Sequence, residues 1–224
     1  MPATHRQQAA VAACYAALAA ALRPPTMEQL QALVAWTGSG LWTLAAQMTP
    51  GPDLGRHLER LAEEVRNACA SPEALEQLAQ DHARLFSGPY HLEAPPYESL
   101  YVHASGQVMG EATAAVRRLY AEAGLALAEE WRDLPDHLVA ELSFMAHLCQ
   151  AVARRGARGR WAAAQRWQHR FLQEHLARWL PLLRQRLAAA RACPFYLAAV
   201  GAAETLVLAH LEVLRAGQGE SPNG

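Results

Sequence analysis

The fold is decided by the stretch Asp133–Leu148, which reads DLPDHLVAELSFMAHL. Apolar residues recur in it at the three- and four-residue spacing of an α-helix. The stripe they form consists of Leu138, Leu142, Met145 and Cys149. Pro135 suits the first position of such a helix, and Asp136 suits the positive end of its dipole. The pattern therefore predicts a helix over residues 135–153 with one face in the core of the protein.

The polar residues that open this helix have three interpretations. Asp136 and His137 could simply cap a helix N-terminus. His137 could instead be a general base that Asp136 or Glu141 orients. Alternatively, His137 and Glu141, four residues apart, share a face with Phe144 and Leu148 and place an acidic, histidine-bearing patch beside an apolar surface. Carboxylates bind guanidinium groups bidentately, so such a patch would suit a cationic, amphipathic peptide.

Helical signals also occupy most of the remaining chain. Thr26 and Gln29 form the pattern of a capping box, and Ser71 is a good N-cap before a proline. Further helices are expected at Gln107–Ala123, Trp161–Ala177, Leu180–Ala190 and Pro194–Leu214. The apolar run from Ala9 to Leu22 is alanine-rich and too short to span a bilayer, so we expect a soluble first helix rather than a signal peptide.

These patterns predict an all-α class. We expect one orthogonal helical bundle of about ten helices over residues 1–216, followed by a disordered tail at 217–224. Residues 87–106 break the helical pattern, because they contain three prolines and two glycines. This segment is rich in tyrosine and leucine, which indicates an ordered loop packed on the body. The segment carries Tyr90, Tyr97, Glu98 and Tyr101, and its tyrosines either stack on arginine side chains of a ligand or only pin the loop.

Composition and the absence of known motifs argue against several classes of function. The net charge is −1, which gives no reason to expect nucleic acid or an anionic membrane as a partner. All 20 basic residues are arginine, so no lysine is present for a Schiff base or a P-loop. The four cysteines form no CxxC pair, which favours reduced thiols in the cytosol. The sequence has no GxxxxGK[ST], HExxH, Glu-x-x-His or GxSxG pattern, so we predict no cofactor, no metal site and no enzyme activity.

Four parts of the sequence resemble a known family when taken in order. They are CYAALAAALRPPTMEQLQAL, the pair RLFSGPY and APPYESLY, LPDHLVAELSFMAHL, and FLQEHLARWLP followed by PFYLAAV. In these motifs the chain resembles the TorD/DmsD family of redox-enzyme maturation chaperones and, more distantly, the NarJ group. The resemblance covers about Ala9 to Leu214. Tyrosines stand here where well-known members have tryptophans, and Asp133 stands closer to the Pro-Asp-His signature than the family's acidic residue.

The resemblance implies an all-helical cytoplasmic chaperone, monomeric or a domain-swapped homodimer. Such a protein binds the twin-arginine signal peptide of a molybdopterin-dependent oxidoreductase and shields the apo catalytic subunit until the molybdenum cofactor is inserted. The family's site residues carry over to Leu85, Phe86, Tyr90, Tyr97, Ser99, Tyr101, Gly110, Pro135, Asp136 and His137. Asp136, Glu141 and Glu98 would then face the two arginines. The alternative functions are an all-α scaffold that binds a small ligand or nucleotide between its helices, and an enzyme with His137 as its base.

Overall fold

The computed structural model describes residues 5–47, 53–88, 92–102, 110–154 and 158–219. Within these ranges the structure is helical, and a single antiparallel bridge between Tyr97 and His137 is its only β pairing. The first half contains α1 (His5–Ala21), α2 (Met27–Thr37), α3 (Leu41–Gln47), α4 (Asp53–Ala68), α5 (Pro72–His82), the π-helical turn η1 (Ala83–Ser87) and α6 (Ser99–Val102). The second half contains α7 (Glu111–Glu122), α8 (Leu138–Ala153), α9 (Arg158–Phe171), the π-helical turn η2 (Leu172–Leu176), α10 (Ala177–Ala189) and α11 (Pro194–Gly219). The all-α bundle is confirmed.

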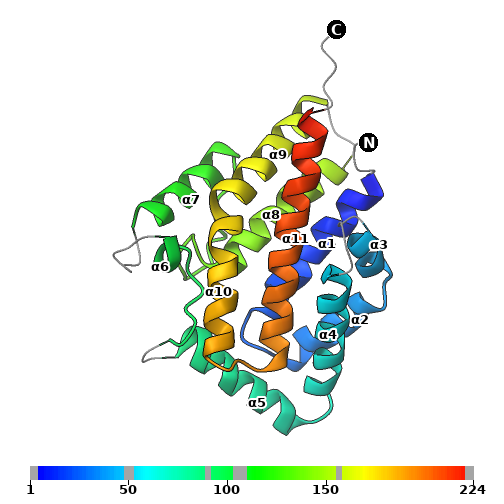
Figure 1. Ribbon diagram of the computed structural model, residues 1–224, viewed down its shortest axis with the longest axis vertical. Coiled ribbons are helices and arrows are strands. Elements are labelled where there is room, and N and C mark those ends of the chain that lie inside the picture. Colours follow the sequence, from blue (N-terminus) through cyan, green and yellow to red (C-terminus); the bar gives the residue numbers. More distant parts are fainter. Residues whose placement is uncertain (1–4, 48–52, 89–91, 103–109, 155–157, 220–224) are drawn as a thin grey trace.

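Three helix pairs make extensive contacts in the core. Helix α8 packs along α1, and α11 packs against α4 and α10 (Figure 1). Helix α11 runs through the middle of the bundle, and its stretch Pro194–Ala216 is long and apolar enough to cross a membrane. Because 72% of its most apolar window is buried inside the protein, α11 is the core helix of the bundle.

The helix starts follow the capping chemistry of the sequence. Thr26 and Gln29 form the expected capping box at α2, and the Ser71 side chain accepts a hydrogen bond from the Ala74 backbone N–H at α5. Helix α8 corrects the prediction, because it begins at Leu138 and not at Pro135. His137 is the N-cap, with its Nδ1 accepting from the Val139 N–H at 3.1 Å.

The second half of the chain departs from the expected boundaries in two places. The two helices predicted on either side of residue 178 are one continuous helical segment, because η2 joins α9 to α10 and Pro181 lies inside α10. Helix α11 continues to Gly219, which places residues 217–219 of the expected disordered tail in a helix. The helix predicted at Gln107–Ala123 is α7, which starts at Glu111; residues 103–109 lie outside the described residues.

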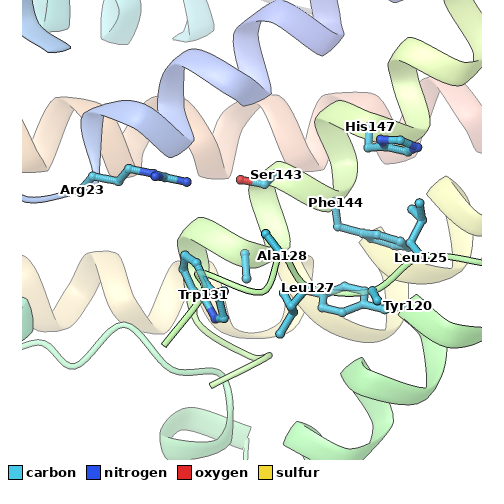
Figure 2. A pocket seen from close by; sticks show the side chains of 11 residues that line it. Arg23, Tyr120, Leu125, Leu127, Ala128, Trp131, Ser143, Phe144 and His147 are labelled. Carbon is cyan, nitrogen blue, oxygen red and sulfur yellow. The ribbon is translucent and has the colours of Figure 1, made fainter. Parts of the chain in front are cut away.

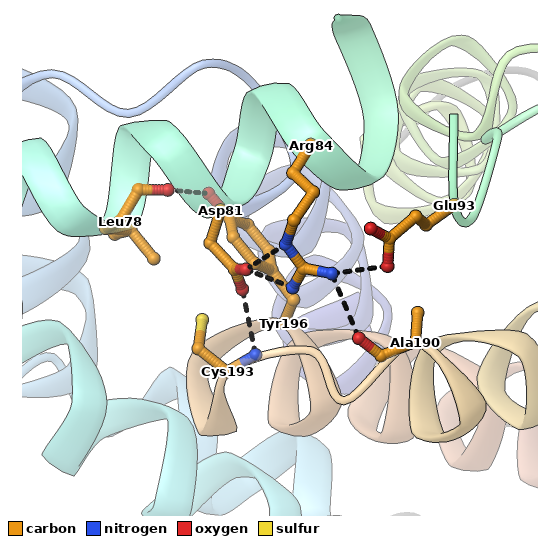
Figure 3. A network of polar contacts seen from close by, with 7 residues as sticks. All are labelled: Leu78, Asp81, Arg84, Glu93, Ala190, Cys193 and Tyr196. Atoms are coloured by element: carbon orange, nitrogen blue, oxygen red, sulfur yellow. Dashed lines mark hydrogen bonds and ion pairs between the residues drawn. The ribbon is translucent and has the colours of Figure 1, made fainter. Parts of the chain in front are cut away.

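An arginine anchors the middle loop to the bundle (Figure 3). The Arg84 guanidinium, on η1, pairs with Asp81 and with Glu93 of the loop, and it donates to the Ala190 carbonyl at 3.0 Å. Asp81 also accepts from the Cys193 N–H at 2.8 Å, at the start of α11. The loop is therefore ordered around residues 92–98, as expected.

Candidate functional site

Asp136 is completely buried and caps a helix that is distant in sequence. Its Oδ2 accepts a hydrogen bond from the Ser99 N–H at 3.0 Å, at the first residue of α6. Two backbone hydrogen bonds join the same segments, from the Glu98 N–H to the Asp136 carbonyl at 3.0 Å and from the Leu138 N–H to the Pro96 carbonyl at 2.9 Å. The Pro-Asp-His segment therefore fastens the tyrosine-containing loop to the start of α8.

His137 lies between two aromatic rings at the edge of the same junction. Its ring meets Tyr97 edge-on with centroids 5.3 Å apart and Trp131 with centroids 5.6 Å apart. Burial lowers the pKa of His137 to about 4. Since Nδ1 accepts from a backbone N–H, the proton of the neutral ring is on Nε2, which lies 3.9 Å from Asp133 Oδ2. A weakly basic imidazole in this arrangement is poorly suited to act as a general base.

Glu141 and Glu98 form a buried polar cluster with two residues from the second half of the chain. Glu98 Oε2 lies 2.8 Å from His175 Nδ1, and Glu141 Oε2 accepts from Trp179 Nε1 at 3.0 Å. The π-helical turn η2 carries His175, and α10 carries Trp179. Burial, and next the charge of Glu98, raises the pKa of Glu141 well above its usual range. The raised pKa favours the neutral, protonated form of Glu141, which lets two carboxyl groups share one interior site.

The structure changes the expected picture of an exposed acidic patch. Asp136 and Glu141 have no exposed surface, and Glu98 is 1% exposed, so these carboxylates are enclosed by the folded chain. Four of the other expected site residues are also buried: Leu85, Phe86, Ser99 and Pro135. Tyr97, Tyr101, Gly110 and His137 are partly exposed, and Tyr90 lies outside the described residues. Tyr101 is held by its hydroxyl, which donates to the Pro95 carbonyl at 2.9 Å.

A cavity of about 640 Å³ opens beside His137, and we call it the His137 cavity. Tyr97, Phe86 and His137 contribute to its wall from the expected set. Its rim carries two exposed carboxylates, Glu130 and Asp133, and one exposed guanidinium, Arg132, all of which precede the Pro-Asp-His segment. Asp133 stands out in the sequence beside the Pro-Asp-His segment, whereas Glu130 does not, because no local pattern shows that residues 128–134 lie beside the start of α8.

Two further hollows continue from this cavity along α8. The Phe144 cavity, about 230 Å³, lies between residues 125–131 and the side chains of Ala140, Ser143 and Phe144 (Figure 2). The α1–α8 groove, about 590 Å³, is lined by Ala12, Ala13, Ala16, Ala19, Ala20, Arg23, Gln29, Ser143, Ala146, His147 and Gln150. The Phe144 cavity shares Trp131 with the His137 cavity and Ser143 with the groove. Acidic, aromatic and small apolar surfaces thus follow one another along one side of α8.

The described part of the chain offers neither a metal site nor an activated thiol. No group of three or more histidine, cysteine, aspartate or glutamate side chains there could hold a metal ion. Burial raises the pKa of the Cys14 thiol to about 12 and that of Cys149 still higher, so neither thiol is a reactive nucleophile at neutral pH. The arrangement is suited to binding a polar and apolar chain segment.

Comparison with known proteins identifies the family. The family model described as "Nitrate reductase delta subunit" matches residues 51–185, more than half of the chain. The "Chaperone protein TorD" of Photobacterium profundum is 26% identical over 163 residues, which cover 73% of this chain and 76% of that protein. The "Perchlorate reductase assembly chaperone protein" of Dechloromonas aromatica is 34% identical over 137 residues, or 59% of this chain and 61% of that protein. The "Selenate reductase assembly chaperone protein" of Thauera selenatis is 48% identical over 64 residues, or 28% of this chain and 33% of that protein.

The matched region of the family model runs from just before α4 into α10 and includes the loop, the Pro-Asp-His segment and the buried cluster. The relatives carry the names of chaperones and not of catalysts. The chain belongs to the nitrate reductase delta subunit family, and it is a chaperone of redox-enzyme maturation.

Proposed function

We propose that this protein binds the twin-arginine signal peptide of a molybdopterin-dependent oxidoreductase in the cytoplasm. It would hold the apo catalytic subunit until the molybdenum cofactor has been inserted and so prevent premature export. It would act as a monomer or as a domain-swapped homodimer. The names of the relatives, which concern the assembly of perchlorate and selenate reductases, support a client of the same kind.

One observation carries the proposal, namely the two exposed carboxylates at the rim of a cavity that continues into an apolar groove. Asp133, whose side chain is 41% exposed, and Glu130 can each accept a guanidinium group. Neither has an arginine partner among the described residues. They therefore offer what the buried carboxylates of Asp136 and Glu141 do not, a negative charge that an incoming arginine pair can reach.

The groove beyond the carboxylates suits the apolar part of such a peptide. Alanines of α1 form its floor from Ala12 to Ala20, a distance of about 12 Å along the helix axis. Small side chains on one helix leave room for bulky side chains on its partner, as in other complexes of an amphipathic helix with a groove. A helical segment of roughly eight residues fits this length.

The expected site residues then divide into two roles. Tyr97, Phe86 and His137 line the His137 cavity and would contact the peptide. Asp136, Ser99, Glu98 and Glu141 would act indirectly, because they hold the loop and α8 in register. The remaining expected residues within the described ranges, Leu85, Tyr101, Gly110 and Pro135, would support the loops around the cavity.

The test is calorimetric titration with twin-arginine signal peptides of molybdoenzymes, each paired with a control in which Arg-Arg is replaced by Gln-Gln. We expect micromolar or tighter binding of one peptide and its loss in the control. The double variant Glu130→Gln/Asp133→Asn should weaken binding at least tenfold, because two charge-assisted contacts are removed. The matched variant Glu129→Gln changes a neighbouring exposed carboxylate that lines none of the three hollows, and should bind as the wild type does. Equal binding of the Arg-Arg and Gln-Gln peptides would refute the proposed function.

A further inference from the structure

Arg23 occupies the point where the three hollows meet. It follows the end of α1, its side chain is exposed, and it lines the His137 cavity, the Phe144 cavity and the α1–α8 groove. Figure 2 shows the side chain extending from the end of α1 toward Ser143 on α8. A ligand that passes from the carboxylate rim into the groove must therefore pass this guanidinium.

Arg23 belongs to the arginines that have no carboxylate partner among the described residues. Several arginines on the surface are held in ion pairs: Arg56, Arg60, Arg84, Arg170 and Arg184. Among the residues that the structure describes, no ion pair joins Arg23 to an acidic side chain. Its planar guanidinium is free to donate two parallel hydrogen bonds to a carboxylate.

The charges along the path have a fixed order. Glu130 and Asp133 lie at the rim of the His137 cavity together with Arg132, whose guanidinium donates to the Glu129 carbonyl, so the rim keeps a net negative charge. Arg23 lies at the junction of the three hollows. Beyond Arg23 the lining of the α1–α8 groove is alanine, with the neutral polar side chains of Gln29, Ser143 and Gln150 and the exposed imidazole of His147 at its edges. A peptide that matches this order carries positive charge first, a negative charge next and an apolar segment last.

We propose that Arg23 selects client peptides by pairing with a carboxylate that lies between the arginine pair and the apolar segment. This inference rests on the proposed function. The pairing would also set the direction of the bound peptide, since the reversed orientation places the arginine pair away from Glu130 and Asp133 and leaves the Arg23 charge against apolar side chains. Like charges at such a junction disfavour peptides with a basic residue there.

The experiment uses synthetic peptides with an Arg-Arg pair, four polar residues and a ten-residue leucine- and alanine-rich segment. A single Asp is moved through the four intervening positions, and Asn and Lys replace it in two control series. With the full-length protein we expect one position at which Asp binds about fivefold more tightly than Asn, the size of a good exposed ion pair. Lys at that position should bind more weakly than Asn.

The variants Arg23→Gln and Arg23→Glu connect this preference to Arg23. Arg23→Gln should abolish the difference between Asp and Asn, and Arg23→Glu should reverse it in favour of Lys. The control is Arg118→Gln. Arg118 is exposed on α7 and lines none of the three hollows, so this variant should retain the wild-type preference. Circular dichroism confirms that each variant is folded.

The outcomes separate the two proposals. If the wild type distinguishes Arg-Arg from Gln-Gln peptides but Arg23 variants show the same Asp, Asn and Lys preferences as the wild type, the role of Arg23 is refuted and the proposed function stands. The same conclusion follows if no Asp position differs from Asn in the wild type. If Arg-Arg and Gln-Gln peptides bind equally, the proposed function is refuted and the role of Arg23 with it.

Discussion

The carboxylate of Asp136 accepts a hydrogen bond at 3.0 Å from the backbone N–H of Ser99, a residue 37 positions earlier in the chain. The acidic residue that precedes α8 is therefore the cap of α6 and not of its own helix. The residue next to it, His137, caps α8. One dipeptide thus caps the N-termini of two helices and aligns the loop with α8 beside the His137 cavity.

Asp136→Ala should lower the free energy of unfolding by about 1–3 kcal/mol, because it leaves a buried N–H without an acceptor. Asp136→Asn should cost less, since the amide oxygen can still accept from Ser99. Urea unfolding followed by tryptophan fluorescence measures both. A smaller loss for alanine than for asparagine would contradict the capping role.

Asp136→Ala should also weaken peptide binding more than Asp136→Asn does. Asp136 is buried, so any loss of affinity would arise from displacement of the loop that carries Tyr97. Titration of the peptide that binds the wild type checks this. A loss of affinity in Asp136→Asn without any change in stability would show direct contact with the ligand.

Glu141→Gln should reduce the fall in the free energy of unfolding that accompanies rising pH. The folded state raises the pKa of Glu141, chiefly by burial, so between pH 4.5 and that raised value the folded state binds more protons than the unfolded chain. In the wild type this carboxyl group therefore contributes a loss of stability as pH rises. Glutamine stays neutral and keeps an oxygen for Trp179 Nε1.

We expect Glu141→Gln to gain stability relative to the wild type at pH 8 and to differ little from it at pH 4.5. Chemical unfolding at four pH values provides the comparison. A variant whose difference from the wild type is the same at both ends of this range would show that Glu141 does not carry the proton in the folded state.

His137→Asn should reduce the loss of stability in mild acid. The folded state lowers the pKa of His137 from 6.5 to about 4, so the unfolded chain binds the extra proton first and stability falls as pH drops through this window. A difference of this size corresponds to roughly 3 kcal/mol at most. Asparagine is a good N-cap and does not titrate, so α8 keeps its start.

The measurement is the free energy of unfolding between pH 7.5 and pH 4. A weaker acid dependence should remain in His137→Asn, because burial also lowers the pKa of His210 to about 4. The control His147→Asn, at an exposed position of the same helix, should retain the wild-type slope. An unchanged slope in His137→Asn would contradict the buried neutral imidazole.

Gly201→Ala tests the close approach of α11 and α4. A Cβ on Gly201 would lie 2.7 Å from His57 Cε1 and 2.8 Å from His57 Nδ1, so alanine must displace the imidazole. In the wild type this displacement should cancel the gain in helix propensity of up to about 1 kcal/mol. In His57→Ala the space is free, and the substitution should stabilise the protein by roughly that amount.

A double-mutant cycle in urea measures this coupling. We expect Gly201→Ala to be about 1 kcal/mol more favourable in the His57→Ala background than in the wild type. Equal effects in the two backgrounds would show that the helices do not meet through His57.

Much of the fold was predictable from local patterns. The periodicity of Asp133–Leu148 and the caps at Thr26 and Ser71 act within a few residues, and each predicted a helix that the structure contains. Boundaries were less predictable. Pro135 fits a first helical turn, but the Leu138 N–H is drawn to the Pro96 carbonyl, so α8 starts three residues later.

The sequence by itself determined the all-helical class, the ordered loop and the position of the Pro-Asp-His segment at the start of α8, because these depend on short-range spacing and backbone chemistry. Only the tertiary structure decided which carboxylates are reachable. Glu98, Asp136 and Glu141 are enclosed by segments up to 77 residues away, whereas Glu130 and Asp133 stay at the rim of a cavity. Burial and the partners of each charge arise from contacts between distant segments, and no periodicity within one helix records them.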